Sequence, residues 1–370
     1  ASMIHNEMRK HGIKLVLGYT VEGFKGKDNG VEVLLKDNPS LQADMVVLAI
    51  GVTPDTVLAK EAGLELGIKE SIVVNDRMET SVPDIYAAGD AVQVKHYVTG
   101  NDALISLAGP ANKQGRIIAD NICGGDSRYL GSQGSSVIKV FDMTAATTGI
   151  NETNAKKSGL EVDTVILSPM SHAGYYPGGK VMTMKVVFEK ETYRLLGAQI
   201  IGYEGVDKRI DVLATAIHAG LKATQLKDLD LAYAPPYSSA KDPVNMAGFM
   251  IDNIAKGTLK QWHLEDMDKI SRDKSVVLLD VRTVGEFNRG HMDGFKNIPV
   301  DELRERINEI EKGKPVYLIC QSGLRSYIAS RILEGNGYET YNFSGGFRFY
   351  DAVVNDRALI EKAYACGMDY

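Results

Sequence analysis

Apolar positions along this chain gather into short runs separated by polar and glycine-rich stretches, a pattern typical of strands buried between helices. In the first third of the chain it predicts a hairpin that turns at Asp28-Asn29-Gly30, several buried strands and two helices. The hairpin strands are expected at 21–24 and 31–35, the buried strands at 13–17, 44–50 and 85–88, and the helices at 3–11 and 103–123.

Between residues 137 and 256 the pattern changes to five strands interleaved with three helices, which predicts an α+β block. Lys256 to Trp262 is expected to be the hinge to a last domain. The strands are expected at 137–141, 145–150, 162–168, 182–188 and 195–201, and the helices at 152–158, 205–219 and 244–256.

In the last quarter of the chain single strands and helices alternate, which predicts an α/β domain. Buried strands are expected at 276–279 and 316–319, and a helix follows Cys320. Arg282 and Glu286 are spaced to pair on one face of a short helix. The fold class is therefore α/β with an α+β block inside it, and the predicted domains are 1–136, 137–257 and 258–370.

Composition and charge exclude some classes of function for this chain. A chain of 370 residues has room for two or three domains, and its net charge of -6 argues against general nucleic-acid binding. No apolar run approaches the length of a membrane span, and residues 3–10 lack the apolar core of a secretory signal. The three cysteines are too far apart for a disulfide framework or a zinc site, so we expect no metal and a cytoplasmic location. Of these, Cys123 and Cys366 are expected to be bystanders.

The stretch from Thr80 to Asp90 carries the first candidate site. Ala87, Ala88 and Gly89 are small, so a flat ligand can approach the backbone closely. Asp90 follows the expected strand, at the edge where open α/β sheets place ligands, and its carboxylate suits a sugar or polyol hydroxyl. The alternative is a tight turn in which Asp90 caps a helix.

Cys320 carries the second candidate site, because it ends an expected strand and precedes an expected helix. Loop N–H groups and the helix dipole would favour its thiolate, which is the nucleophilic form. Gly323 permits the tight loop, and Arg325 supplies a positive charge for an anionic sulfur species. A buried structural cysteine is the alternative. A phosphatase with a Cys-x5-Arg loop is disfavoured because Ile319, rather than histidine, precedes Cys320.

Two loops rich in glycine and proline, residues 171–179 and 233–243, carry Tyr175, Tyr176 and Tyr237. A phenol can donate a proton to a thiolate leaving group and then hold that group by a hydrogen bond. Aromatic packing within the loops is the alternative for these side chains.

Thr80 to Asp90, with residues 49–54 upstream, resembles the second flavin-binding motif of the FAD-dependent pyridine nucleotide–disulfide reductases. In that family the aspartate holds the ribityl chain of FAD, and a helix near a segment like 109–116 directs its positive end at the flavin. The alternative for 109–116 is a plain surface helix. The resemblance implies FAD and NAD(P)H as cofactors. The implied cofactor-binding residues are Gly51, Gly89, Asp90, Leu107, Ala108, Pro110 and Pro236.

The chain from about Leu264 to Tyr370 resembles a rhodanese domain, in which Cys320 would carry a persulfide. Residues 137–257 resemble the dimerisation domain of the same reductases, so a homodimer is implied. Residues 1–136 resemble the C-terminal parts of the NAD(P)H- and FAD-binding domains of a flavoprotein core. The rhodanese resemblance rests on Asp280-Val281-Arg282, Gly290-His291 to Gly294, Asn297-Ile298-Pro299 and Ser344-Gly345-Gly346.

This domain order matches the coenzyme A-disulfide reductase–rhodanese fusions, also described as NADH-dependent persulfide or polysulfide reductases. The loop Tyr233-Ala234-Pro235-Pro236-Tyr237 resembles the branch of the family in which tyrosines replace a His–Glu pair. The resemblance implies Tyr237 first, and Tyr175 or Tyr176 second, as catalytic residues beside Cys320 and Arg325. Coenzyme A disulfide, coenzyme A persulfide or polysulfide are the implied sulfur substrates.

The chain departs from this family in one respect: it has no G-x-G-x-x-G turn and no first flavin-binding segment, which carries the family's redox cysteine. Three hypotheses therefore stay open. The chain is part of a full flavin reductase whose missing N-terminal segment exists elsewhere; or it is an NADH oxidase or peroxidase with an auxiliary rhodanese domain. The third is a flavin-free sulfurtransferase module.

Overall fold

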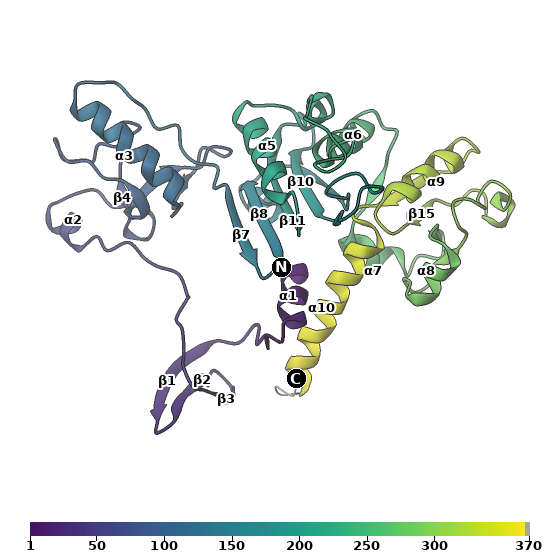
Figure 1. The fold of residues 1–370 in the computed structure, drawn as a ribbon, viewed down its shortest axis with the longest axis horizontal. Coiled ribbons are helices and arrows are strands. Elements are labelled where there is room, and N and C mark those ends of the chain that lie inside the picture. The colour runs from purple at the N-terminus through teal and green to yellow at the C-terminus, as the bar shows by residue number, and fades with distance from the viewer. Residues whose placement is uncertain (367–370) are drawn as a thin grey trace. The chain divides into compact units, whose positions relative to one another are not determined.

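The computed structural model describes residues 1–366, with side chains described through residue 360. Figure 1 labels the helices and strands of this range along the chain. Within it the chain forms two compact units. The first unit contains residues 1–96 and 100–132 together with the chain from Val353 onward, and the second contains residues 97–99 and 133–352.

The first unit begins with helix α1 and an antiparallel sheet in the order β1-β2-β3. Lys27 pairs with Gly30, so the chain turns at Asp28 and Asn29, and the hairpin prediction is confirmed. The third strand was not predicted because it opens on residues 38–40, Asn-Pro-Ser, which are typical of turns. The bounds are α1 Ser2–Lys10, β1 Val21–Lys27, β2 Gly30–Leu35 and β3 Asn38–Ala43.

A second small sheet in this unit has the order β4-β5-β6 and packs against helix α3. Ile117 and Ile118 of α3 contact a buried cluster that includes Val92 and Val94 of β5. The helix begins at Ala108, five residues later than expected, because the preceding strand β6 pairs with β5. The bounds are α2 Val57–Glu61, β4 Ile72–Val73, β5 Val92–Lys95, β6 Asp102–Ala103 and α3 Ala108–Ile122.

Three expected strands of this unit are wrong, because their residues pair with no strand of the described chain. Tyr86 alone makes an isolated bridge, to Glu79. Met45 and Ile50 are 76% and 90% exposed, although their apolar run predicted burial. An apolar pattern indicates that a segment tends to be buried, but a strand also needs a neighbour to pair with. The segments concerned are 13–17, 44–50 and 85–88.

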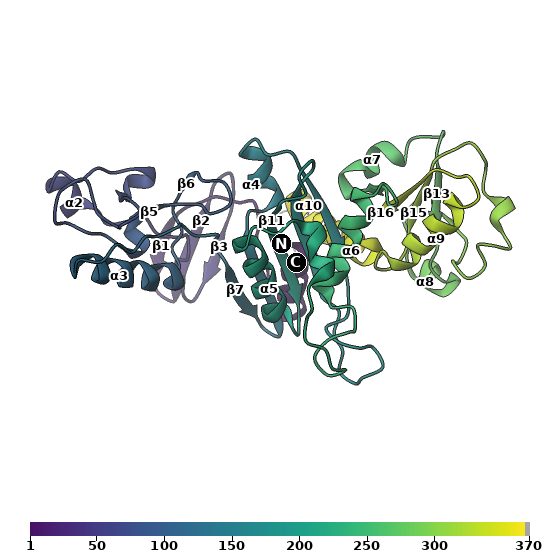
Figure 2. The same ribbon diagram turned by 90° about the horizontal axis from the view of Figure 1, so that it is seen from above.

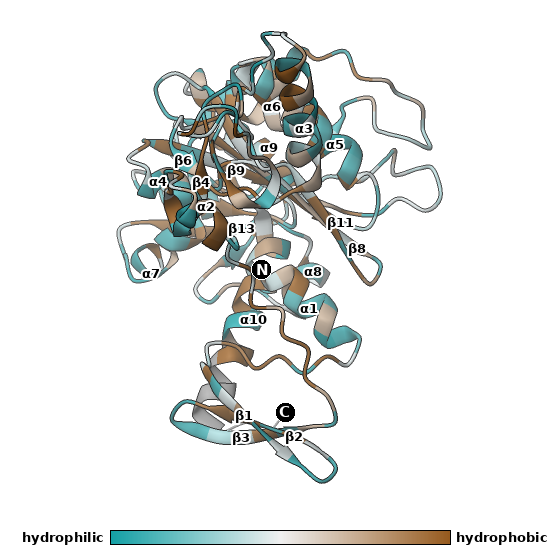
Figure 3. Cartoon of the chain, turned by 90° about the vertical axis from the view of Figure 1, so that its left-hand side faces the viewer, coloured by the Kyte–Doolittle hydropathy of each residue, from teal (hydrophilic) through white to brown (hydrophobic). Residues whose placement is uncertain are grey.

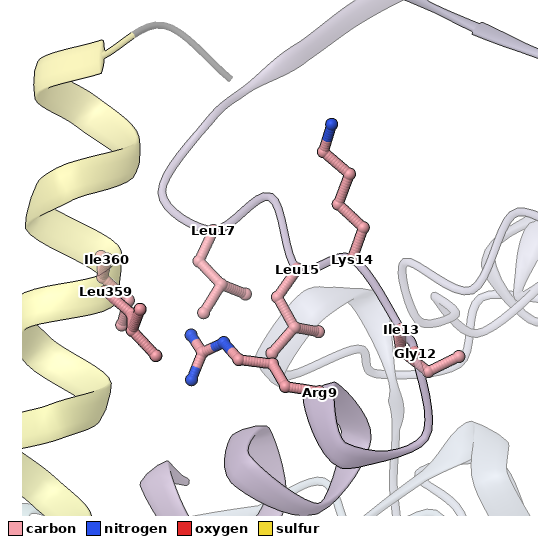
Figure 4. A pocket seen from close by; sticks show the side chains of 8 residues that line it. All are labelled: Arg9, Gly12, Ile13, Lys14, Leu15, Leu17, Leu359 and Ile360. Carbon is pink, nitrogen blue, oxygen red and sulfur yellow. The ribbon is translucent and has the colours of Figure 1, made fainter. Parts of the chain in front are cut away.

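The later part of helix α10 (Gly346–Cys366) belongs to the first unit because it packs against α1. The buried carboxylate of Asp356 accepts a hydrogen bond of 2.6 Å from Arg9 and lies 2.9 Å from Nδ1 of His5. Burial would raise the pKa of Asp356, but these two partners outweigh it and keep the pKa below its usual value. A cavity of about 290 Å³ beside this contact is lined by Leu15 and Leu359, among others (Figure 4).

The second unit contains an antiparallel sheet in the order β7-β8-β11-β10-β9. Helices α5 and α6 pack against it (Figure 2). The core that they form with the sheet includes Val186, Leu213 and Val244. All five expected strands and all three expected helices are confirmed to within two residues. The bounds are β7 Ser136–Val140, β8 Met143–Gly149, α4 Glu152–Lys157, β9 Val162–Leu167, β10 Thr183–Glu189, β11 Leu195–Gly202, α5 Val206–His218 and α6 Pro243–Ala255.

A second, parallel sheet follows in the order β12-β16-β15-β13-β14. Two of its inner strands, β13 (labelled in Figure 3) and β15, are mostly apolar, because both faces of the sheet are covered. The rings of Trp262 and Phe343 pack at a tilt, with centroids 4.4 Å apart, inside this domain. The bounds are β12 Gln261–Trp262, α7 Met267–Ile270, β13 Val277–Asp280, α8 Val284–Arg289, β14 Lys296–Asn297, β15 Val316–Ile319, α9 Leu324–Glu334 and β16 Thr340–Phe343.

Hydrogen bonds join the two sheets of the second unit. The Ile166 N–H donates to Ser344 Oγ over 3.0 Å, and Gln261 Nε2 donates to the Thr164 carbonyl over 2.7 Å. Among the helices that the structure describes, none is long and apolar enough to cross a membrane. Short 3₁₀ turns complete the chain at Ile68–Glu70, Gly89–Ala91, Ala223–Asp228, Leu264–Asp266 and Ile307–Glu309.

Candidate functional site

Strand β15 delivers Cys320 to the carboxyl edge of the parallel sheet, and a short loop leads from it into α9. The residue is only 1% exposed. The Gly323 N–H donates to Cys320 Sγ over 3.1 Å, and the Ser326 hydroxyl lies 3.2 Å from the same sulfur. Gly323 has φ +102°, a conformation that favours glycine. The loop thus places an amide donor and a hydroxyl donor at the sulfur.

Arg325 is held by a carboxylate from another helix. Its Nη1 and Nη2 each donate to Glu286 over 2.7 Å, one to each carboxylate oxygen. This charge-assisted fork, opposed by burial and aided by Thr283, lowers the pKa of Glu286 to about 2. The same hydrogen bonds raise the pKa of Arg325, so the guanidinium beside the Cys320 loop stays charged.

The predicted pairing of Arg282 with Glu286 is wrong. Arg282 instead pairs with Asp280 over 2.7 Å and lies over the ring of Phe347, with both charged side chains buried. The reason is local, because Thr283 caps α8 and Arg282 therefore precedes the helix. The contact between residues four positions apart holds only when both lie in the helix.

The two tyrosine loops meet beside a cavity of about 520 Å³ in the second unit. Tyr233, Pro236 and Tyr237 line it. The hydroxyls of Tyr175 and Tyr233 are 2.9 Å apart, and these phenols and that of Tyr237 are solvent-exposed. Exposed hydroxyls at a cavity can meet a ligand, which aromatic rings packed in a core cannot do.

Tyr176 has a different position within the first loop. Its ring packs edge-on against His172, with centroids 5.7 Å apart. His172 is buried, and its Nδ1 lies 3.1 Å from the carbonyl of Ala173. Tyr176 is nevertheless 43% exposed, so this contact leaves both the packing interpretation and the catalytic one open.

Arg209 fixes the shape of this pocket, and the sequence reading missed it. The side chain is buried and pairs with Asp242 over 2.9 Å. It also donates to the carbonyls of Ser171 and Tyr237, over 2.9 and 3.3 Å, and so ties both loops to α5. The sequence did offer a signal for this pair. Asp242 directly precedes Pro243 at the start of an expected helix, and a carboxylate buried there needs a positively charged partner.

Gly89 and Asp90 lie in a 3₁₀ turn that packs against α3 in the first unit. The Gly89 N–H donates to Gln114 Oε1 over 2.7 Å, and Gln114 is buried. A Cβ added at Gly89 would come within 3.9 Å of Ala111 in the first turns of the helix. The Asp90 carboxylate is exposed, so it is available to a ligand at this position.

The other expected cofactor residues are divided between different parts of the chain. Leu107 precedes α3 as its N-cap, and Ala108 and Pro110 lie in its first turn. Gly51 lies in an exposed segment without secondary structure, and Pro236 lies in the tyrosine pocket of the second unit. The structure therefore places Leu107, Ala108 and Pro110 at the start of the helix that Gly89 contacts, whereas Pro236 belongs to the second unit.

Three segments of the chain match known families. Residues 1–115 match the family described as pyridine nucleotide-disulphide oxidoreductase, and residues 135–243 match its dimerisation domain. Residues 263–352 match the rhodanese-like domain.

Two solved structures are similar over almost the whole chain. One is that of reduced Bacillus anthracis CoADR-RHD, with 46% identity, a TM-score of 0.92 and 96% of this chain covered. The other is an NAD-dependent persulfide reductase from A. fulgidus, with 40% identity, a TM-score of 0.86 and 95% of this chain covered. This chain covers 64% of each of those chains.

A curated relative from Pyrococcus abyssi, a CoA-dependent NAD(P)H sulfur oxidoreductase, is 37% identical over 242 residues. The match covers 65% of this chain and 54% of the relative. The chain therefore spans about half the length of the curated relatives that it matches.

Proposed function

Because its segments belong to the pyridine nucleotide-disulphide oxidoreductase and rhodanese-like families, we propose that this chain is part of a reductase of sulfur–sulfur bonds. Its substrates would be coenzyme A disulfide, coenzyme A persulfide or polysulfide, and Cys320 would carry sulfane sulfur. The observation that carries the proposal is the Cys320 sulfur itself, which accepts the Gly323 N–H and lies beside the Ser326 hydroxyl.

The sulfur-carrying step needs only this chain's thiolate and a persulfide donor. The Cys320 thiolate attacks the terminal sulfur of R–S–SH, the donor S–S bond breaks, and R–S⁻ leaves as Cys320 becomes a persulfide. An acceptor thiolate then takes the terminal sulfur and returns Cys320 to the thiolate. Both steps conserve electrons and protons. Donors at Sγ favour the anionic sulfur that this exchange requires, and Arg325, fixed by Glu286, adds positive charge.

The first unit has features that fit FAD, which when bound supplies electron transfer from NAD(P)H to the sulfur–sulfur bond. Asp90 offers an exposed carboxylate for polyol hydroxyls, and Gly89 leaves room above Ala111 of α3. The first N–H groups of α3, at Ala108 and Gly109, have no acceptor within the helix and favour an anionic ring system. Leu107 and Pro110 shape the same helix start.

In the tyrosine pocket, Tyr237 would protonate the departing coenzyme A thiolate. Tyr175 would assist by its hydrogen bond of 2.9 Å to the hydroxyl of Tyr233, which lines the same pocket. The dimerisation domain supports a homodimer as the working form. A cytoplasmic location is part of the proposal, because the reducing cytoplasm keeps a nucleophilic cysteine in its thiol state.

The test is sulfur transfer from thiosulfate to cyanide by the purified chain. Cys320→Ser should reduce it to background, because the nucleophile is gone. Cys123→Ser, which alters an exposed cysteine at the end of α3, is the matched control and should leave the rate unchanged. Full activity in Cys320→Ser would contradict the proposal.

A further inference from the structure

The tyrosine pocket, the cavity of about 520 Å³ beside the two tyrosine loops, carries charged groups that the proposed function does not use. Glu204 and Lys208 line it together with Tyr233 and Tyr237. Glu204 lies two residues before α5 begins, and Lys208 lies in the first turn of that helix. The pocket therefore presents one carboxylate and one ammonium group in addition to its phenols.

Neither of these two charges is neutralised within the described part of the chain. Glu204 is exposed, and no described residue pairs with its carboxylate. Lys208 forms no ion pair there either, and its Nζ lies 3.5 Å from the carbonyl of Ala232, which is longer than an ordinary hydrogen bond. Arg209, which also lines the pocket, is already paired with Asp242 over 2.9 Å. Glu204 and Lys208 are thus the charges that a ligand can reach.

His172 adds a buried acceptor to the same pocket. The residue lines the pocket, is 5% exposed, and places Nδ1 3.1 Å from the carbonyl of Ala173. Since a carbonyl can only accept, Nδ1 carries the hydrogen, and the neutral ring leaves Nε2 as an acceptor. No described residue donates to Nε2. A buried acceptor of this kind is destabilising unless water or a ligand supplies the donor.

We propose that the tyrosine pocket binds the α-amino acid head of cystine or of cysteine persulfide. The ammonium group of the ligand donates to Glu204 and to Nε2 of His172, and its carboxylate accepts from Lys208. Its sulfur lies toward the phenols of Tyr233 and Tyr237. An α-amino acid carries both charges on one carbon atom, which matches a pocket that holds one unpaired group of each sign. The choice of a sulfur amino acid rests on the proposed function, whereas the choice of an amino acid does not.

Calorimetric titration of the full 370-residue chain with lanthionine tests the proposal. Lanthionine has a single sulfur in place of the disulfide of cystine, so it cannot exchange with the cysteines of the chain. It should bind, and cystine should displace it. Bis(aminoethyl) sulfide lacks both carboxylates, and thiodipropionate lacks both ammonium groups. Each should bind at least about tenfold more weakly than lanthionine, the effect of losing charge-assisted hydrogen bonds.

Two variants identify which residue binds which end of the ligand. Glu204→Gln should weaken lanthionine binding about tenfold and leave thiodipropionate binding unchanged, because thiodipropionate has no ammonium group to lose a partner. Lys208→Met should weaken lanthionine binding by a similar factor and leave the binding of bis(aminoethyl) sulfide unchanged. Glu191→Gln and Lys157→Met, which remove exposed charges outside the pocket, are the matched controls and should bind lanthionine normally.

Absence of lanthionine binding by the wild type would overturn the inference, as would equal binding by the wild type, Glu204→Gln and Lys208→Met. Failure of cystine to displace lanthionine would also overturn it. Thermal melting of each variant without ligand separates loss of the site from loss of the fold. Lanthionine binding that depends on both residues, in a chain that fails to transfer sulfur, would leave the site standing and refute the proposed function. Sulfur transfer without lanthionine binding would do the opposite.

Discussion

Arg325 and Glu286 lie on different helices, α9 and α8, and two hydrogen bonds of 2.7 Å fix the guanidinium beside the Cys320 loop. A free arginine side chain would move among rotamers and would spread its charge over a larger volume. The two hydrogen bonds to Glu286 hold the charge of Arg325 in one place, and they occupy two of the N–H groups of the guanidinium. Glu286 is therefore a positioning residue for the sulfur site.

Glu286→Gln should slow sulfur transfer about tenfold, because a neutral amide holds the guanidinium less firmly than a carboxylate does.

The pKa of Glu286 in the folded protein, about 2, lies below the ordinary value of 4.5. The contribution of the pair to stability is therefore complete above pH 4.5 and declines as the pH falls toward 2. The free energies of unfolding of the wild type and of Glu286→Gln, measured in urea, should therefore differ more at pH 7 than at pH 3. An equal difference at both pH values would contradict this assignment, and Glu302→Gln, at a surface pair, is the control.

The sequence identified Cys320, Gly323 and Arg325 because they share one strand–loop–helix motif within a few residues. It could not identify the partner of Arg325, because Glu286 is 39 positions away and the contact exists only once both helices pack on one sheet. The wrong pairing of Arg282 with Glu286 has the same origin: spacing predicts contacts only within a continuous helix.

Arg209 and Asp242 perform a comparable task between elements. Arg209 projects from α5, and Asp242 caps α6 by accepting from the Val244 N–H over 3.0 Å. Burial would raise the pKa of Asp242, but hydrogen bonds from Arg209 and Ser238 outweigh it and hold the pKa below its usual value. The ion pair thus joins two helices and both tyrosine loops in one network.

Arg209→Met should destabilise the chain by roughly 3–5 kcal/mol, because it leaves the Asp242 carboxylate buried without its partner. Urea unfolding at pH 7 measures this. Lys208→Met, at the neighbouring half-buried position of the same helix, is the control and should change stability little. If Arg209→Met lowers the free energy of unfolding no more than the control does, the network does not hold these elements together.

The elements of the second unit were predictable because each strand's partners are present in the same stretch of chain. Val162–Leu167 and Leu195–Gly202 both combine apolar runs with pairing partners in the antiparallel sheet. The run at 44–50 has an equally apolar pattern but no partner in the described chain, and most of its side chains are exposed. Burial propensity is local in sequence, whereas strand pairing is not.

At the scale of the whole molecule, the proposed chemistry is divided between the two units. Asp90 and the start of α3 lie in the first unit, and the Cys320 loop and the tyrosine pocket lie in the second. Consumption of coenzyme A disulfide rather than oxygen by the flavin-loaded protein with NADH would separate a disulfide reductase from an oxidase. Sulfur transfer by Cys320 is common to every version of this account that includes a working rhodanese-like domain.

The most direct test is mass spectrometry of the chain after incubation with a persulfide donor. The account predicts a gain of one sulfur atom on the peptide that contains Cys320, and removal of that sulfur by cyanide. A gain on the exposed Cys123 instead, or no cyanide-labile sulfur at all, would contradict it.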